Sequence, residues 1–308
     1  MARKRKGDPI HGWLIIDKPE GISSAKAVAI VRRTTNAAKV GHGGTLDPMA
    51  TGVLPIALGE ATKTVSWVMD GSKEYEFTVL FGSATNTDDA EGEVTETCEH
   101  LPTDAEIEAA LPAFRGVIEQ TPPAYSAIKV DGQRSYALAR KGEAVALAPR
   151  RVEVPEFRLV GRDGEASARF VARTGKGTYI RALARDLARA AGSCGHLTRL
   201  RRTRVGPFAA DAAIQLETLE NLGHSAALPR HLLAVETALD DIPALALTQA
   251  EARKLHHGQA VAALPVLERE GSDPVSAGDI VAALSDQKLV ALAEIKGGEI
   301  RPVRVFNF

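Results

Sequence analysis

The spacing of apolar residues predicts three strands in the first two thirds of the chain. The uninterrupted apolar run at residues 13–16 predicts a short buried strand, which ends in the turn residues at 17–21. Apolar and polar residues alternate over residues 74–81, and again over residues 166–173. Because successive side chains of a strand point to opposite faces, each alternating segment predicts a strand with one buried face.

Helices are predicted where apolar residues recur every three or four positions behind a capping residue. Ser23 or Ser24 begins the first. A capping box at residues 103–106 opens a second, which Pro112 ends or kinks. A third runs from about Tyr179 to Ala191, with Gly192 as its C-cap and with arginines every four residues on a face of their own. Strands interrupted by helices without a regular βαβ rhythm predict a mixed α/β or α+β domain.

The pattern changes near residues 241–243. A helical start at residues 248–255 is followed by short apolar segments separated by Gly, Asp and Pro, most clearly at 280–284 and 289–293. Short strands with such turns are typical of a small β-barrel. A chain of 308 residues is also long for one core, so we predict one domain at 1–241 and a second at 242–308.

Composition argues against a membrane protein and against disorder. Hydrophobic residues at 44% and charged residues at 25% match the globular average, and no apolar run approaches the roughly 18 residues that span a bilayer. The basic residues 1–7 are not followed by a long apolar stretch, as a secretory signal would require. Cys98 and Cys194 give neither a disulfide framework nor a metal cluster, so we expect two reduced thiols in a cytoplasmic protein.

The net charge of −1 conceals two segments of opposite sign. Residues 88–108 hold nine acidic residues and no Lys or Arg, and they predict an exposed acidic loop. Residues 173–204 hold nine basic residues against the single acid Asp186. Clustered arginines indicate a polyanionic partner, since the guanidinium binds phosphate in a bidentate manner. A solvated face with internal salt bridges is the alternative.

The densest candidate for chemistry is the loop Gly41-His-Gly-Gly-Thr-Leu-Asp-Pro-Met-Ala-Thr-Gly52. Its glycines allow the backbone to approach a ligand closely, and Pro48 restricts Asp47 to an extended conformation. A rigidly presented carboxylate suits nucleophilic or general-base work, while an Asx-Pro turn is the alternative.

Other catalytic motifs fail on spacing. Residues 174–178 resemble a phosphate loop, but the upstream glycine is missing and Gly177 stands where Ser or Thr should hold a metal. Residues 42–44 resemble a hydrolase oxyanion loop, yet the chain holds no complete G-x-S-x-G nucleophile motif. His256 and His257 have no third ligand nearby in sequence. We therefore expect neither a metal nor a nucleotide cofactor.

Six segments match, in order, the motifs of one family. The loop at 41–55 resembles its catalytic motif, and five others resemble its opening motif, strand tyrosine motif, RNA-gripping insertion, arginine motif and the segment that follows: Asp17-Lys-Pro-Glu-Gly-Ile-Ser-Ser24, Lys73-Glu-Tyr75, residues 120–136, residues 176–186 and residues 197–203. These matches span residues 13–208. The family is the TruB-type tRNA pseudouridine synthases, and the C-terminal segment resembles the PUA barrel of its bacterial members.

The resemblance implies a fold and an activity. The fold is an α+β catalytic domain at 1–241 with an RNA-gripping insertion at about 120–151, followed by a PUA-like domain at 242–308. The activity is isomerisation of uridine to pseudouridine at position 55 in the T-loop of tRNA, by base flipping and by cleavage and re-formation of the glycosidic bond. Such chemistry requires no cofactor and no metal.

The resemblance also assigns roles. Asp47 would be the catalytic carboxylate, kept ionised and directed by a charge-assisted bond from Arg181. Tyr75 would stack on the flipped base, Leu200 would help wall the pocket, and His42 would fill the space that the base leaves. The remaining candidates for substrate binding are Tyr179, for which core packing is the alternative, together with Lys18, Lys129 and Arg134.

One residue departs from the family pattern, and the partners follow from the resemblance. Gly43 stands where the family commonly has Thr, which makes the role of His42 less secure. The expected partner is tRNA, through its T-arm and, at the C-terminal domain, its acceptor end. We expect a cytoplasmic monomer without membrane contact. The alternatives are a catalytically silent tRNA-binding or tRNA-folding protein and, less well supported, an esterase without a nucleophile.

Overall fold

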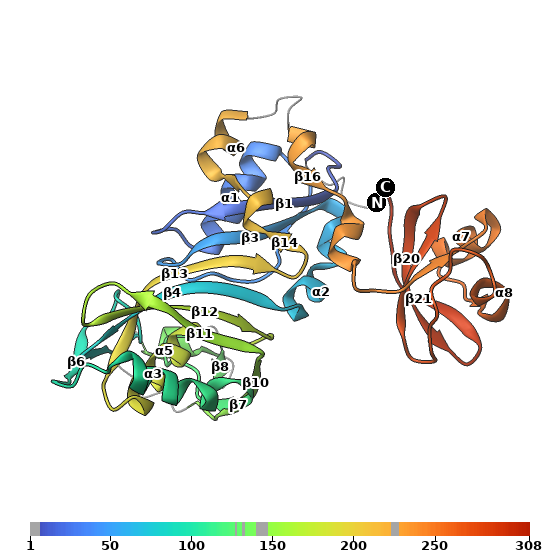
Figure 1. Ribbon diagram of the computed structural model, residues 1–308. Coiled ribbons are helices and arrows are strands. Elements are labelled where there is room, and N and C mark those ends of the chain that lie inside the picture. Colours follow the sequence, from blue (N-terminus) through green and yellow to red (C-terminus); the bar gives the residue numbers. More distant parts are fainter. Residues whose placement is uncertain (1–6, 127, 131–132, 140–146, 223–227) are drawn as a thin grey trace.

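The structure is a computed structural model that describes residues 7–126, 128–130, 133–139, 147–222 and 228–308. Its centre is a ten-stranded mixed sheet (Figure 1). Its main path runs in the order β11 (Glu156–Arg162), β12 (Ser167–Thr174), β4 (Lys73–Phe81), β13 (Gly195–Val205), β3 (Thr51–Leu58), β1 (Gly12–Lys18) and β15 (Ile214–Gln215). Short strands at its sides are β2 (Val40–His42), β14 (Phe208–Ala209) and β16 (Leu232–Leu233). The pairs β3–β13 and β1–β15 are parallel, and the other pairs are antiparallel.

The predicted strands are confirmed, and their burial explains their sequence patterns. The apolar run at 13–16 lies in β1, where Leu14 and Ile16 face one hydrophobic cluster while Trp13 and Ile15 face another. A strand buried on both faces cannot alternate with polar residues, because neither face meets water. In β4, by contrast, Phe77 and its alternating neighbours pack into only the first cluster.

Helices cover the first face of the sheet. The first cluster receives apolar side chains from α1 (Ser24–Thr35), α3 (Asp104–Ala110), α5 (Ile180–Ala190) and α6 (Leu216–Leu222). The predicted starts are confirmed. Ser23 caps α1 by accepting a bond from the Lys26 N–H, and the capping box opens α3, which gives way to the 3-10 turn η2 (Leu111–Phe114) at the predicted proline. Gly192 has φ of 78° after α5, as a helix C-terminus favours.

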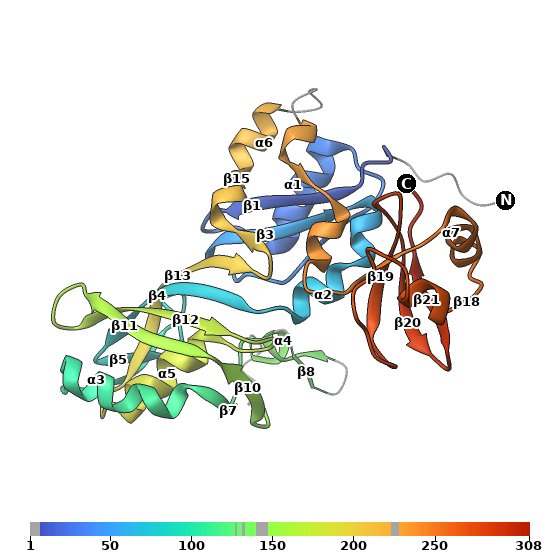
Figure 2. The same ribbon diagram turned by 45° about the vertical axis from the view of Figure 1, so that its right-hand side comes forward.

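The opposite face of the sheet is covered by α2 (Val65–Asp70), by the 3-10 turns η3 (Ala210–Ala212) and η5 (Val235–Leu239), and by a second sheet. A further 3-10 turn, η1 (Gly59–Lys63), follows β3, and η4 (Leu228–His231) precedes β16. The second sheet has five strands in the order β17 (Ala244–Ala246), β19 (Ile280–Ser285), β20 (Lys288–Lys296), β21 (Glu299–Val305) and β18 (Val261–Ala262). It curls beside the short helices α7 (Gln249–His256) and α8 (Leu264–Leu267), on the α2 side of the molecule (Figures 1 and 2).

The C-terminal sheet is joined to the rest of the molecule by packing. Leu289, Leu292 and Phe306 lie in one hydrophobic cluster with Trp13 of β1. The Lys63 ammonium donates to the Val305 carbonyl oxygen at 2.7 Å. The second sheet therefore buries apolar surface of the main domain, in addition to having its own core.

Three pairs of strands lie outside the two larger sheets. The strands β7 (Gly116–Gln120) and β10 (Arg150–Val154) pair with each other, and the predicted insertion lies between them. Its described parts form the small hairpin β8 (Lys129–Val130) and β9 (Gln133–Arg134) and the helix α4 (Ser135–Ala139). The acidic segment at 88–108, expected to be an exposed loop, instead contains β6 (Val94–Thr97), which forms a hairpin with the preceding strand β5 (Ser83–Thr85).

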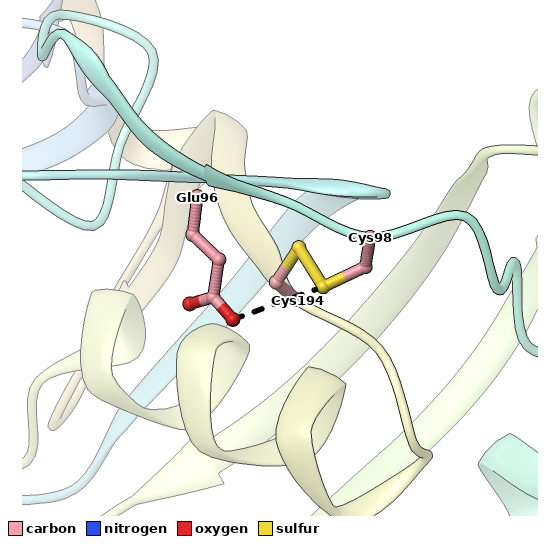
Figure 3. Close-up of side chains that lie close together, drawn as sticks. All are labelled: Glu96, Cys98 and Cys194. Atoms are coloured by element: carbon pink, nitrogen blue, oxygen red, sulfur yellow. Dashed lines mark hydrogen bonds between the residues drawn. A yellow bond between two sulfur atoms is a disulfide. The ribbon is translucent and has the colours of Figure 1, made fainter.

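The two cysteines contradict the expectation of free thiols. Cys98 follows β6 and Cys194 precedes β13, and the structure joins them in a disulfide with their Cα atoms 5.8 Å apart (Figure 3). That separation lies within the usual range for a disulfide. The expectation was wrong because a separation of 96 residues in sequence does not reveal that the turn after α5 lies against the acidic hairpin.

None of the helices in the described ranges is both long and apolar enough to cross a membrane.

Candidate active site

A cavity of about 430 Å³ opens where the glycine-rich loop, β4, β13 and the start of α5 meet. Its volume lies within the usual range for sites that bind small organic groups. Five of the residues proposed from the sequence line it together: Asp47, Tyr75, Tyr179, Arg181 and Leu200. The structure therefore brings side chains from four separate segments to one place.

The loop that carries Asp47, between β2 and β3, is fixed from three directions. Ser24 at the start of α1 both accepts from the Leu46 N–H at 2.8 Å and donates to the Leu46 carbonyl at 2.9 Å. The Lys18 ammonium donates to the Pro48 carbonyl at 3.1 Å. The Arg202 guanidinium donates to the Thr45 carbonyl at 3.2 Å. Since each bond ties backbone rather than side chain, the Asp47 carboxylate is left free to face the cavity.

Arg181 binds the Asp47 carboxylate directly. Its Nη2 lies 2.9 Å from Asp47 Oδ2, and its Nη1 lies 3.3 Å from an oxygen of Asp89. The Arg181 and Asp89 side chains are 6% and 4% exposed, whereas that of Asp47 is 37% exposed. Asp89 thus neutralises the buried side of the guanidinium, and Asp47 is the member of the group that a ligand can reach. A charge-assisted hydrogen bond of this kind fixes the orientation of the Asp47 carboxylate and also stabilises its charge.

Arg181 also donates to two backbone carbonyls. Its Nη1 donates to Thr87 at 3.0 Å, and its Nη2 donates to Tyr125 at 2.9 Å. Thr87 lies in the turn of the β5–β6 hairpin, and Tyr125 lies in the predicted insertion. The direction of Arg181 therefore depends on both segments.

Tyrosine rings form two walls of the cavity. Tyr75 projects from β4, opposite Arg202 of β13 in the strand register. Tyr179 is held by Gln120, whose side-chain oxygen accepts from the Tyr179 N–H at 2.8 Å and whose amide donates to the Tyr179 carbonyl at 3.1 Å. The Arg150 guanidinium lies 5.0 Å from the centre of the Tyr179 ring, a cation–π distance. Tyr179 therefore faces the cavity rather than the core.

Two residues expected to touch substrate do not line the cavity. Lys18 has no exposed surface, and its ammonium is bonded to the carbonyls of Pro19, Ile22 and Pro48. Burial lowers its pKa to about 8, against an opposing contribution from the Asp47 charge. Backbone carbonyls accept from the Lys18 ammonium at three places, so the structure gives this residue a role in holding the chain beside Asp47, and its predicted contact with substrate stays a prediction.

His42 is the second of these residues. It ends β2 half-buried, outside the cavity lining, with a buried Nδ1 that has no hydrogen-bond partner in the described part of the chain. Burial, and then the charge of Arg202, lower its pKa. The remaining candidates Lys129 and Arg134 pair in register across β8–β9, but their side chains lie outside the described residues.

The packing around Gly43, where the family commonly has Thr, leaves no space for a side chain. A Cβ atom at this position would lie 2.7 Å from Cγ1 of Val68 and 3.4 Å from the ring of Trp13. Val68 is 1% exposed, in the second hydrophobic cluster. The space that a side chain at position 43 requires is therefore filled from α2.

Sequence reasoning missed three charged residues of the site. Asp89 and Arg202 lay in segments interpreted as exposed, yet both are buried. Lys73 lines the cavity and donates to the carbonyls of Met69 and Gly71 at the end of α2. Its pKa falls to about 8, mainly through burial and then through the charge of Arg202. The sequence did contain a signal for the burial of these acids. Two adjacent acids at 88–89 and two arginines four residues apart on one helix, Arg181 and Arg185, can form two ion pairs side by side.

The basic segment is only in part a free surface. Arg181 and Arg185 pair with Asp89 and Asp88 at 3.3 and 2.9 Å, and Arg201 pairs with Asp17 at 2.9 Å. The exposed cations of the segment are Arg173, Lys176, Arg189 and Arg199. The alternative of internal salt bridges thus holds for several of its arginines.

One group of three potential metal-ligand residues was found among the described residues, and it lies outside the cavity. It consists of Glu96, Cys98 and Cys194, with the Cys98 sulfur 4.0 Å from an oxygen of Glu96 (Figure 3). The two sulfur atoms are already bonded to each other.

Two family models match consecutive parts of the chain. Residues 32–180 match the N-terminal domain of TruB family pseudouridylate synthase, and residues 181–240 match the C-terminal domain of tRNA pseudouridylate synthase B. Curated relatives include two proteins named tRNA pseudouridine synthase B, from Caulobacter vibrioides and Rhodospirillum rubrum. Each is 52% identical, over 100% of this chain, and the alignments cover 99% and 100% of those proteins.

Solved structures share the fold. A chain of a Cbf5-Nop10-Gar1 complex aligns with a TM-score of 0.74 and 25% identity, over 100% of this chain and 90% of that one. A chain of an H/ACA ribonucleoprotein bound to a substrate RNA that contains 2'-deoxyuridine aligns with a TM-score of 0.75 and 24% identity, over 100% and 92%.

Proposed function

The chain belongs to the TruB family of pseudouridylate synthases, and from this premise we propose that it isomerises uridine to pseudouridine at position 55 in the T-loop of tRNA. The observation that carries the proposal is the Asp47–Arg181 pair, at 2.9 Å, on the wall of a cavity that Tyr75 and Leu200 also line. A half-exposed carboxylate, a buried guanidinium behind it and an aromatic wall together suit chemistry on a flipped base.

The reaction rearranges bonds within one nucleotide. The bond from ribose C1' to uracil N1 breaks, the uracil turns, and a new bond joins C1' to C5. The C5 hydrogen then leaves as a proton and N1 gains one, so atoms and electrons balance without an external oxidant or reductant. Asp47 is the group that acts on the nucleotide, since a fixed carboxylate serves as nucleophile or base. Arg181 directs the Asp47 oxygen toward the cavity.

The cavity walls suit an extruded base. Removing a base from its stack costs a few kcal/mol, and stacking on an aromatic side chain returns about 1–3 kcal/mol. Tyr75 supplies the stacking ring, and Leu200, 8% exposed beside it, supplies an apolar wall. Tyr179 closes a third side, held by Gln120 and Arg150.

RNA contacts outside the cavity are assigned by charge and position. Tyr125, Tyr136 and Arg150 of the insertion line the cavity, and we assign contacts with the phosphates of the T-arm to the insertion and to the exposed cations of residues 173–204. We divide the chain into a catalytic domain at 1–241 and a PUA-like domain at 242–308, which would contact the acceptor end. We assign the protein a monomeric state and a cytoplasmic location, where tRNA is available.

Release of tritium from a tRNA transcript labelled at C5 of uridine tests the proposal, because the isomerisation frees that hydrogen. We expect release of one equivalent per tRNA, and none from a transcript in which uridine 55 is replaced by cytidine. Release from both transcripts would contradict the assigned position. Tight tRNA binding without any release would instead favour a catalytically silent tRNA-binding protein.

A further inference from the structure

Tyr179 occupies a position of its helix that usually holds a smaller polar residue. It is the N-cap of α5, with an extended backbone at φ of −104° and ψ of 117°, and its side chain makes no capping hydrogen bond in the described part of the chain. Helix starts favour Ser, Thr, Asp or Asn, because their short side chains accept from the free N–H groups of the first turn. The ring of Tyr179 therefore does not serve the helix that it begins.

The backbone of Tyr179 is fixed from β7 instead. The Gln120 side-chain oxygen accepts from the Tyr179 N–H at 2.8 Å, and the Gln120 amide donates to the Tyr179 carbonyl at 3.1 Å. The N–H and the carbonyl of one extended residue point to the same side, so a single carboxamide can bind both as a neighbouring strand would. The same carbonyl accepts the first bond of the helix, from the Leu183 N–H at 3.1 Å. Gln120 is 1% exposed, so water does not replace either of its bonds.

Arg150 holds the same segment from the partner strand. It lies directly opposite Gln120 in the β7–β10 register, and opposite residues of an antiparallel pair present their side chains on one face. Its Nη2 donates to the Gly177 carbonyl at 2.6 Å, and its guanidinium lies 5.0 Å from the centre of the Tyr179 ring. Gln120 therefore fixes the backbone of Tyr179, while Arg150 faces its ring.

Gln120 and Arg150 mark the two ends of the insertion. The strand β7 ends at Gln120 and β10 begins at Arg150, so the segment between them leaves the paired strands at one residue and returns at the other. Arg185 of α5 donates to the carbonyl of Thr121, the residue after Gln120, at 2.8 Å. The first turns of α5 are therefore bonded to the base of the insertion, and the direction of Tyr179 is set from outside its own helix.

On the basis of the proposed function, we propose that Gln120 is a positioning residue for the isomerisation, which directs the Tyr179 ring into the cavity. The direction of a Cα–Cβ bond follows from the backbone, so fixing the N–H and the carbonyl of Tyr179 fixes where its ring enters. Tyr179 and Asp47 line the same cavity, so the ring limits the orientations that a flipped uracil can adopt beside the carboxylate. Without Gln120, the base samples orientations in which Asp47 does not meet it.

A double-mutant cycle tests this role. Gln120→Met keeps the size of the side chain but removes its donor and its strong acceptor. Single-turnover tritium release should slow roughly 5- to 100-fold, the size of one or two lost hydrogen bonds. The affinity for tRNA should change less than about threefold, because Gln120 is buried away from RNA. In the Tyr179→Leu background, where the ring is absent, Gln120→Met should slow the reaction less than about threefold.

The matched control is Ser193→Ala, which removes a buried hydrogen bond outside the cavity. The Ser193 hydroxyl donates to the His100 carbonyl at 2.7 Å, so its loss should leave the rate of release near that of the wild type. An equal loss from Gln120→Met in both backgrounds would overturn the inference and leave the proposed function standing. A wild-type protein that releases no tritium would overturn the proposed function and, with it, the role of Gln120 in the reaction.

Fluorine NMR separates the position of the ring from the stability of the protein. The chain has four tyrosines, so protein labelled with 3-fluorotyrosine should give four signals, and that of Tyr179 is identified by its loss in Tyr179→Phe. We expect Gln120→Met to shift or broaden the Tyr179 signal and to leave that of Tyr75 in place, while Ser193→Ala should move neither. A Tyr179 signal that is unchanged in Gln120→Met would refute the positioning role.

A measurement on the wild type applies if Gln120→Met does not fold. The N–H of an N-cap residue has no partner within its own helix, and an unbonded N–H exchanges with solvent quickly. Because Gln120 accepts from the Tyr179 N–H, we expect this amide to exchange slowly in hydrogen-exchange NMR. Rapid exchange would show that Gln120 does not hold Tyr179 in solution, and the inference would fall.

Discussion

Replacing Gly43 by alanine tests whether Val68 fills the space of the missing side chain. The new Cβ would lie 2.7 Å from Cγ1 of Val68, which is 1% exposed and has little room to move. Overpacking of this kind costs about 1–3 kcal/mol. Gly43 is not among the glycines with positive φ, so alanine suits its backbone and returns about 0.4–1 kcal/mol by restricting the unfolded chain. We therefore expect a net loss of about 1–2 kcal/mol in the free energy of unfolding.

A control two residues away, in β2, separates the clash from any general effect of alanine in this segment. At Gly41 an added Cβ would meet only Thr62 Cγ2, at 3.9 Å, and the backbone again suits alanine. Gly41→Ala should therefore be neutral or slightly stabilising. Urea unfolding followed by tryptophan fluorescence suits the comparison, because Trp13 lies beside Gly43 and reports on that region.

The clash should also be relieved by a second substitution. Val68→Ala removes the methyl group that an alanine at position 43 would strike, so Gly43→Ala should cost little in that background. The coupling free energy between the two positions should be about 1 kcal/mol or more, as for residues in direct contact. If Gly43→Ala is as stable as Gly41→Ala, or if the two losses simply add, then Val68 does not occupy that space.

Three further predictions concern the site and the second sheet. Arg181→Met should lower single-turnover rates at least 100-fold with little change in tRNA affinity, because Asp47 loses its partner; wild-type rates would mean that the pair does not form. In filter-binding measurements, Tyr75→Phe should bind tRNA like the wild type because it keeps the stacking ring, and Tyr75→Leu should bind less well because it loses the ring. Equal binding by the two variants would show that stacking on Tyr75 does not contribute to affinity. Truncation after Asp241 should lower the melting temperature of the remaining domain, because it exposes the hydrophobic cluster that the second sheet shares; an unchanged melting curve would show that this packing contributes nothing.

The sequence predicts the main strands and helices of this fold well, because the periodicity of apolar residues reflects which side chains are buried. The run at 13–16 and the alternation at 74–81 predict strands buried on two faces and on one face, as the structure has them. Capping residues placed the starts of α1 and α3. These signals are local, since each depends only on a side chain and its near neighbours.

Charged residues were harder to place, because their partners lie far away in sequence. Arg181 is separated by more than 90 residues from Asp89 and by more than 130 from Asp47, and sequence spacing gives no sign that the three meet. The acidic and basic segments were interpreted as exposed surfaces, although they supply each other's ion pairs. Resemblance to a family supplied Asp47 and Arg181 as a pair, but motifs alone did not show that Lys18 is buried.

Arg202 illustrates the same limit. In the sequence it is one of three arginines in four positions, and nothing in that pattern shows which of them is buried. The structure distinguishes them. Arg201 pairs with Asp17 and stays partly exposed, while Arg202 is buried and donates to three backbone carbonyls. Burial of a cation is decided by the strands on either side, which only the folded chain brings together.

The central claim is that Asp47 carries out the isomerisation, and Asp47→Asn tests it most directly. The amide keeps the shape of the carboxylate but is a poor nucleophile and base. We predict tRNA affinity within about threefold of the wild type and no tritium release above background under single-turnover conditions, since loss of an essential group costs many orders of magnitude. Turnover within about tenfold of the wild type would contradict the account.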